Sequence, residues 1–338
     1  MFVRNDTTEH IALASGHVSE TFGAASVVVE NVYRIHADAL ARSDEPPPRG
    51  PSGPPDTSRV VLWREVSVTA AGTAFGPSRP PHVCPVSLTI GSEVARLIVF
   101  GPRWFRRTLV SDLEPSKPEP FDEVTLSWER AFGGEYVVPP GLQPGTGLPH
   151  PGMRARYALN PSGVGFYADR QSATDQPLPD IERPDQLVKR WNDQPTPAGF
   201  SPCPELAALR FPARYHGRGR DLAKGSTASD PRVAAFEDAA AMTLRMQHHA
   251  PGDLVLPVVL PGTAVALVGL GRAPLRFLVP PSPISVRARR LGQDEIAPPR
   301  LRSLHVDADQ RTLTVVYDHA FRYDPLKPPS WVRVGKAS

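Results

Sequence analysis

The chain has 338 residues, enough for one large domain or two ordinary domains with a buried core. Its 38 basic and 35 acidic residues leave a formal net charge of +3, an excess too small to drive phosphate or membrane binding by itself. The 41 prolines argue against a mostly helical protein, because each proline removes a backbone donor and interrupts helices and central strands.

The sequence shows neither a signal peptide nor a membrane-spanning stretch, so we expect a soluble cytoplasmic protein. The first ten residues lack the apolar core of a signal peptide, and the apolar stretches at 254–260 and 264–270 are too short and too broken by Pro and Gly to span a bilayer. The two cysteines, Cys84 and Cys203, lie far apart, which favours two buried reduced thiols over a disulfide.

In chain order, the first half reads as short strands joined by polar connections. Apolar residues predict a strand at 26–35, and residues 43–58 read as a Pro/Gly-rich loop or linker. Further strand-like runs lie at 60–69, 86–90 and 94–100, and Gly91-Ser92 is a good candidate for a hairpin turn between the last two.

The rest of the chain is organised around the stretch at 121–134. Val124, Leu126 and Trp128 alternate with polar residues, which predicts a half-buried strand with Trp128 in the core. Glu129 and Arg130 would form an ion pair that closes the strand, with each other's neighbours across a sheet as partners, and a Gly-Gly pair at 133–134 would end it and begin a long connection. We interpret this stretch as a structural clasp.

The second half begins with little periodic structure. Residues 137–204 are extended and proline-spaced, and loops of this length are uncommon unless they cover or bind something. A helix is predicted at 231–249, because Asp230 can cap it and Pro251-Gly252 stops it. Hairpins are predicted at 264–279 and 304–317.

The predicted fold class is α+β and mostly β, with antiparallel hairpin-built sheets, long Pro/Gly-rich loops and one main helix. The chain reads as essentially one domain over 1–338. Its expected parts are an N-terminal strand region (1–42), a loop or linker (43–58), a β core (59–136), a long irregular cover (137–230), and the helix with C-terminal hairpins (231–325).

Motifs for catalysis or metal binding are missing from the sequence. It has no Gly-x-Ser-x-Gly elbow, no His-Glu-x-x-His, no Walker A loop and no paired Cys-x-x-Cys, so we expect no cofactor and no metal. The basic segment at 217–226 reads as a solvated loop, which disfavours nucleic-acid binding. Asp318 and His319 are better read as surface strand residues than as a general base.

An enzyme is nevertheless the alternative from another class. A hydrolase acting on carbohydrate or cell wall could use Glu129, Asp122 or Asp318. Two carboxylates about 5–10 Å apart across an open cleft would be its structural signature.

A series of motifs runs along the chain in a fixed order, including Leu-Ser-Trp-Glu-Arg-Ala-Phe-Gly-Gly at 126–134. The others lie at 72–77, 86–91, 99–104, 120–125, 160–166, 178–182 and 197–200. Together they closely resemble the domain of unknown function 2169 family, which is encoded beside type VI secretion genes. The sequence departs from the usual pattern near 56–63, 214–217 and 236–240. If those segments contact the client, the departures imply a different or narrower client for this member.

The resemblance covers nearly the whole chain and implies a non-enzymatic type VI secretion accessory protein. Such an adaptor or chaperone would help place an effector on a PAAR-like or VgrG spike protein; a structural part of the spike or baseplate is a further alternative. The family carries no established catalytic residues, so the motif residues are candidates for structural or interface roles. They are Trp104, Phe121, Trp128, Glu129, Arg130, Phe132, Gly133, Gly134, Asn160, Pro161, Gly163, Gly165 and Phe166.

Overall fold

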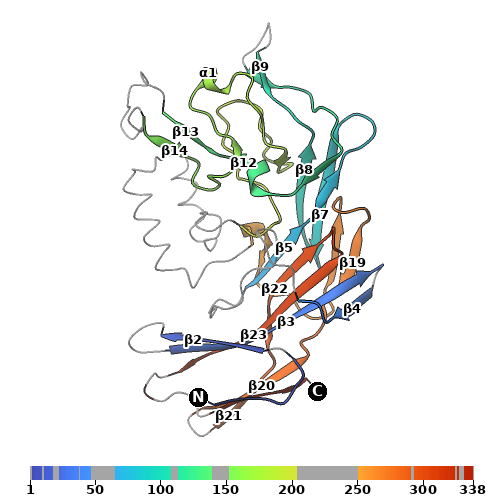
Figure 1. Cartoon of the computed structure of the whole chain (residues 1–338), viewed down its shortest axis with the longest axis vertical. Coiled ribbons are helices and arrows are strands. Elements are labelled where there is room, and N and C mark those ends of the chain that lie inside the picture. Colours follow the sequence, from blue (N-terminus) through green and yellow to red (C-terminus); the bar gives the residue numbers. More distant parts are fainter. Residues whose placement is uncertain are drawn as a thin grey trace.

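The computed structural model describes residues 2–9, 11–17, 23–37, 39–46, 65–107, 113–138, 152–203, 250–290, 293–323, 326 and 331–337. In these ranges the chain is built mostly of strands (Figure 1), which confirms the predicted fold class. The helix predicted at 231–249 and most of the 43–58 linker lie outside the described residues. The α-helix that the described ranges do contain is α1 (Arg170–Ala173).

A seven-stranded sheet forms the middle of the molecule (Figure 1). Its order is β17 (Val255–Leu256), β5 (Val66–Ala71), β22 (Arg300–Asp307), β23 (Thr312–Tyr323), β3 (Gly23–His36) and β2 (Ile11–His17), with β4 (Ala39–Ser43) also paired to β3. The strand predicted at 26–35 is confirmed as β3, and the last predicted hairpin is confirmed as β22–β23. Strand β5 joins β22 in parallel, so this sheet is not built from hairpins alone.

A five-stranded sheet carries the features that matter for the candidate site. Its order is β16 (Ile181–Glu182), β8 (Glu93–Phe100), β7 (Val83–Ile90), β18 (Ala264–Val268) and β19 (Leu275–Leu278). The hairpins β7–β8 and β18–β19 are where the sequence predicts them. Gly91 has φ +58, a left-handed conformation that suits glycine at the tight β7–β8 turn.

A four-stranded sheet brings the two ends of the chain together. Its order is β1 (Phe2–Asn5), β24 (Trp331–Lys336), β20 (Ile284–Arg290) and β21 (Gln293–Ala297), and β1 runs parallel to β24. Both termini therefore lie at the same end of the molecule (Figure 1).

Four two-stranded pairs complete the described structure. They are β6 (Thr73–Phe75) with β11 (Glu123–Thr125), β9 (Phe105–Arg107) with β10 (Leu113–Pro115), β12 (Phe132–Gly133) with β15 (Val164–Gly165), and β13 (Glu135–Val137) with β14 (Arg154–Arg156). Two 3₁₀ turns also matter below, η1 (Trp128–Arg130) and η4 (Gly252–Leu254).

Two apolar clusters hold these elements together. The main cluster joins the three larger sheets, and alternate residues of β5 supply it with Val66, Val68 and Ala70. The smaller cluster includes Trp128 and Phe132 and lies under the loop-rich segment at 152–203. Burial of this apolar area fixes a segment that has few backbone ladders of its own.

The central strand is shorter than the sequence predicts. Strand β11 ends at Thr125, and Trp128 begins the 3₁₀ turn η1 instead of continuing the ladder. The reason lies in the partner strand, because β6 begins at Thr73, the residue opposite Thr125. Leu126 then donates its N–H to the carbonyl of Gly72 at 2.9 Å, and the chain turns inward.

Neither Cys84 nor Cys203 is in a disulfide, as the sequence predicts, but only Cys203 is buried, whereas Cys84 is half-buried. Among the described residues, no helix has the length and apolar character needed to cross a membrane.

Candidate functional site

The motifs at 126–134, 160–166 and 178–182 meet at the smaller apolar cluster, and we call this arrangement the motif cluster. Arg103 and Glu182 form an ion pair there, and their exposed fractions are 6% and 2%. Arg103 also donates to the carbonyl of Pro179 at 2.7 Å, and Glu182 accepts the N–H of Val188 at 2.8 Å. Burial raises the pKa of Glu182, while Arg103 opposes this rise by favouring the carboxylate.

A second, more exposed ion pair fastens the central stretch. Nη1 of Arg130 lies 2.7 Å from Oδ2 of Asp180, and the N–H of Asp180 donates to the carbonyl of Arg130 at 2.9 Å. Burial raises the pKa of Asp180, and Arg130 counteracts that rise. The clasp therefore joins Arg130 to Asp180, whereas the neighbouring Glu129 is exposed.

Trp128 lies at the centre of this arrangement. Its side chain is buried, and Nε1 donates to the carbonyl oxygens of Pro202 at 2.8 Å and Ser201 at 3.2 Å. A Cβ atom at Gly199 would lie 3.1 Å from the indole ring. The tryptophan thus fixes the segment that follows the 197–200 motif.

Asn160 connects the two glycine-rich motifs. Its fully buried side chain donates from Nδ2 to the carbonyls of Trp128 at 2.7 Å and Phe132 at 3.1 Å. Gly133 has φ +150, and a Cβ atom on it would lie 2.0 Å from the carbonyl oxygen of Asn160. A glycine is required at 133 because no side chain fits between these backbones.

The remaining motif residues support the same loops. Phe132 packs edge-to-face on Tyr157 with ring centroids 5.0 Å apart, and the half-buried Phe166 lies 5.4 Å from Tyr157. The other placements are as follows: Trp104 is half-buried and bridges to Pro177, Phe121 packs on the main cluster, Gly134 donates to Asn160, Pro161 is half-buried, Gly163 contacts Asn160, and Gly165 pairs with Gly133.

The three carboxylates of the hydrolase alternative occupy different environments. Asp122 and Glu129 are exposed, whereas Asp318 is fully buried and bonded to Nε of Arg300 at 2.8 Å. The prediction that Asp318 and His319 are surface residues is therefore wrong, since their exposed fractions are 0% and 9%. Their strand, β23, lies between β22 and β3, and all of its residues from Thr312 to His319 are buried, so both faces of this part of the strand are covered.

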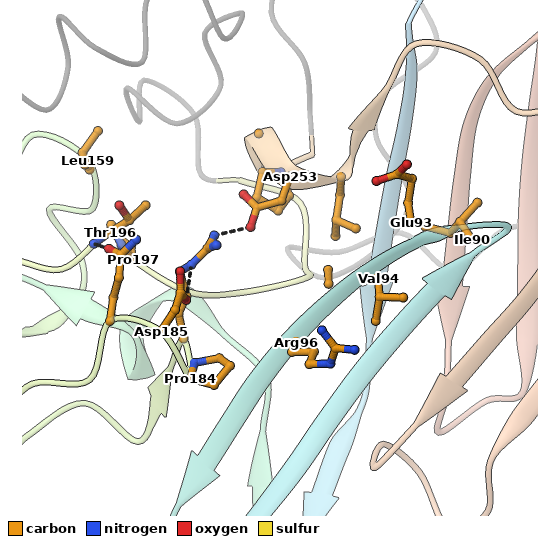
Figure 2. Close-up of a pocket in the computed structure, with 16 residues that line it drawn as sticks. Ile90, Glu93, Val94, Arg96, Leu159, Pro184, Asp185, Thr196, Pro197 and Asp253 are labelled. Carbon is orange, nitrogen blue, oxygen red and sulfur yellow. Dashed lines mark hydrogen bonds and ion pairs between the residues drawn. The ribbon is translucent and has the colours of Figure 1, made fainter.

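A groove of about 620 Å³ lies beside the motif cluster (Figure 2). The β7–β8 hairpin forms one side with Glu93, Val94 and Arg96, and Pro184 and Asp185 lie on the other side. The chain reaches this second side directly after Glu182 of the 178–182 motif, and Pro197 of the 197–200 motif also lines it. The motif cluster thus forms a wall of the groove.

Arg183 braces the groove through two carboxylates. Its Nε lies 3.2 Å from Oδ1 of Asp185, and its Nη1 pairs with Asp253 in η4. Burial alone would lower the pKa of Arg183, but the two carboxylates outweigh this effect and raise it. The same contact with Arg183 lowers the pKa of Asp185. These charges are compensated within the protein, which suits a binding wall better than acid–base chemistry.

Sequence reasoning missed these groove residues. Arg183 and Pro184 follow a motif directly, and Asp253 follows a Pro-Gly pair that reads only as the end of a helix. Among the described residues, no group of three or more His, Cys, Asp and Glu side chains is placed to hold a metal ion.

Comparison with protein families identifies the chain. A family described as an uncharacterized protein conserved in bacteria, DUF2169, matches residues 26–318. The chain belongs to the DUF2169 family. The match confirms the family resemblance and runs from β3 to Asp318 in β23, so that β1, β2 and β24 lie outside it. No curated protein and no solved structure gave a match.

Proposed function

We propose that this DUF2169 protein is a non-enzymatic adaptor or chaperone of type VI secretion. It binds an effector, a PAAR-like protein or a VgrG spike protein in the cytoplasm before secretion, and the groove beside the motif cluster is its binding surface. The type VI connection rests on the resemblance of the ordered motifs, and the family membership supports it.

The observation that carries the proposal is the position of the groove. The groove combines exposed apolar surface at Val94 with charged residues. Its opposite side, with Pro184 and Asp185, follows directly after Glu182, which is held by the buried ion pair with Arg103. Protein-binding surfaces commonly place an apolar anchor region inside a polar rim on a rigid frame. The carboxylates of the hydrolase alternative do not line the groove.

Co-expression tests this proposal. The tagged chain is expressed with each effector and spike protein encoded beside it, and a stoichiometric complex with at least one of them is expected. Failure to bind any of them overturns the adaptor role. Stoichiometric recovery of the chain itself in secreted material would also overturn it and would identify a structural part of the spike or baseplate.

A further inference from the structure

We infer that the partner enters the groove as an added β-strand on the edge of β8. This inference rests on the proposed function, because it states how the partner of that same surface is held. Added strands gain affinity from main-chain hydrogen bonds and specificity from alternate side chains.

The backbone groups of β8 point alternately toward β7 and toward the groove. In an antiparallel strand, alternate residues direct their N–H and C=O groups to opposite sides. Phe100 donates its N–H away from β7, to the carbonyl of Asp180 at 2.8 Å, and Ile98 lies opposite Glu182 of β16 on that side. The pairing of β8 with β7 is continuous from Glu93 to Phe100. Val94 and Arg96 therefore direct their backbone groups to the side of β16, which is the side of the groove.

Strand β16 covers only part of the groove-side edge of β8. Its ladder with β8 stops at Glu182, and in the same register Pro184 would lie opposite Arg96. Proline has no N–H to donate. The chain also turns there, because Gln186 donates its N–H to the carbonyl of Arg183 at 3.1 Å. Over the residues that the structure describes, the β8 edge is thus left without a ladder partner at Val94 and Arg96.

The unpaired part of the β8 edge is exposed. Glu93, Val94 and Arg96 are all exposed, and the groove separates them from Pro184 and Asp185 (Figure 2). Proteins usually cover or block such edges because the open backbone groups pair readily with another chain. Here the edge faces an open groove, so an extended segment can reach it.

Side chains around the edge indicate the chemistry of the segment. Ala95 packs on the main apolar cluster beside the groove, and Leu254 lines the groove from η4. Arg96 forms no ion pair with any described residue, whereas Arg183 has two carboxylate partners. The occupant is therefore an extended segment of the partner, without proline at the pairing positions. It carries an apolar residue toward Ala95 and an acidic residue for Arg96.

Paired substitutions at the two edge positions test the inference. Val94→Pro and Arg96→Pro remove groove-side N–H groups without removing a donor to β7, and Val94→Ala and Arg96→Ala are matched controls that keep the N–H. Each variant is titrated with the effector or spike protein that the wild-type chain binds, after thermal unfolding confirms that it is folded. We expect at least tenfold weaker binding for each Pro variant than for its Ala control.

Amide hydrogen exchange on the wild-type complex covers the case in which a Pro variant fails to fold. The amides of Val94 and Arg96 should exchange quickly in the free chain and slowly in the complex. If a partner binds but these amides stay unprotected, or a folded Pro variant binds within twofold of its Ala control, the added strand is overturned and the adaptor role survives. If no effector or spike protein binds the wild-type chain, the proposed function itself fails.

Discussion

The indole Nε1 of Trp128 lies 2.8 Å from the carbonyl oxygen of Pro202, and this hydrogen bond joins the 126–134 motif to the segment that follows the 197–200 motif, more than 70 residues away. The indole ring of Trp128 also packs closely against Gly199 and contributes to the smaller apolar cluster. Trp128 therefore holds the 197–203 segment in place.

Trp128→Ala should lower the free energy of unfolding by about 3–5 kcal/mol, because it opens a cavity in the smaller cluster. Trp128→Phe keeps much of the ring volume but leaves the Pro202 carbonyl without its donor, which should cost about 1–3 kcal/mol. Urea unfolding measures both. A Trp128→Ala protein that is as stable as wild type but no longer binds its partner would show that the tryptophan is an interface anchor.

Arg103→Met should destabilise the protein by about 3–5 kcal/mol at pH 7, because it leaves Glu182 as an unpaired buried carboxylate. The pKa of Glu182 is already raised by burial, and loss of Arg103 would raise it further. In the unfolded chain the Glu182 carboxyl has its ordinary pKa of 4.5, which is below the folded pKa. The penalty should therefore be small below pH 4.5 and grow as the pH rises through the folded pKa.

The double variant Arg103→Met, Glu182→Leu is the control for the ion pair. It removes both charges, so urea unfolding at pH 7 should show recovery of much of the lost stability. A penalty for Arg103→Met that stays constant between pH 4 and pH 7 would contradict the role given to Glu182.

Gly133→Ala and Gly152→Ala form a matched pair. Both glycines have positive φ, at +150 and +84, but a Cβ at 133 meets the carbonyl of Asn160 at 2.0 Å while a Cβ at 152 meets nothing within 4 Å. Gly152→Ala should cost about 1 kcal/mol of backbone strain, and Gly133→Ala should cost clearly more than the roughly 1–3 kcal/mol typical of strain alone. Equal unfolding midpoints for the two variants would contradict the close approach of the motifs at Asn160.

The buried side chain of His305 should make the stability of the fold decrease in acid. Burial lowers its pKa to about 4, while the unfolded side chain titrates at its ordinary value of 6.5. The unfolded state therefore takes up a proton first as the pH falls, and on the order of 2 kcal/mol of stability should be lost between pH 7 and pH 5. Urea unfolding of wild type and His305→Gln at both pH values measures this loss. An equal loss in the variant would assign it to other groups.

Local signals predict the parts of the fold that depend on neighbouring residues. The alternation at 86–90 and 94–100, with Gly91 at the turn, is enough to predict the β7–β8 hairpin. Contacts between distant segments are not readable in this way. The end of β11 depends on where β6 begins, and the burial of Asp318 depends on the strands on both sides of β23.

The groove is the clearest example of this limit. Its brace joins Arg183 to Asp253 across 70 positions in the sequence, and neither residue belongs to a recognisable local pattern. The open edge of β8 likewise follows from the position of Pro184 in the register of β16, which only the folded chain reveals.

Binding through the groove is tested most directly by titrating the chain with the effector and spike proteins encoded beside it. Val94→Glu places a negative charge beside Arg96, where the acidic residue of the partner is expected, and Val268→Glu is its control on β18, since the two valines are 41% and 39% exposed. We expect wild type and Val268→Glu to bind the same partner equally and Val94→Glu to bind at least tenfold more weakly. Equal binding by Val94→Glu and wild type, or no binding by wild type, would contradict the groove as the binding surface of an adaptor.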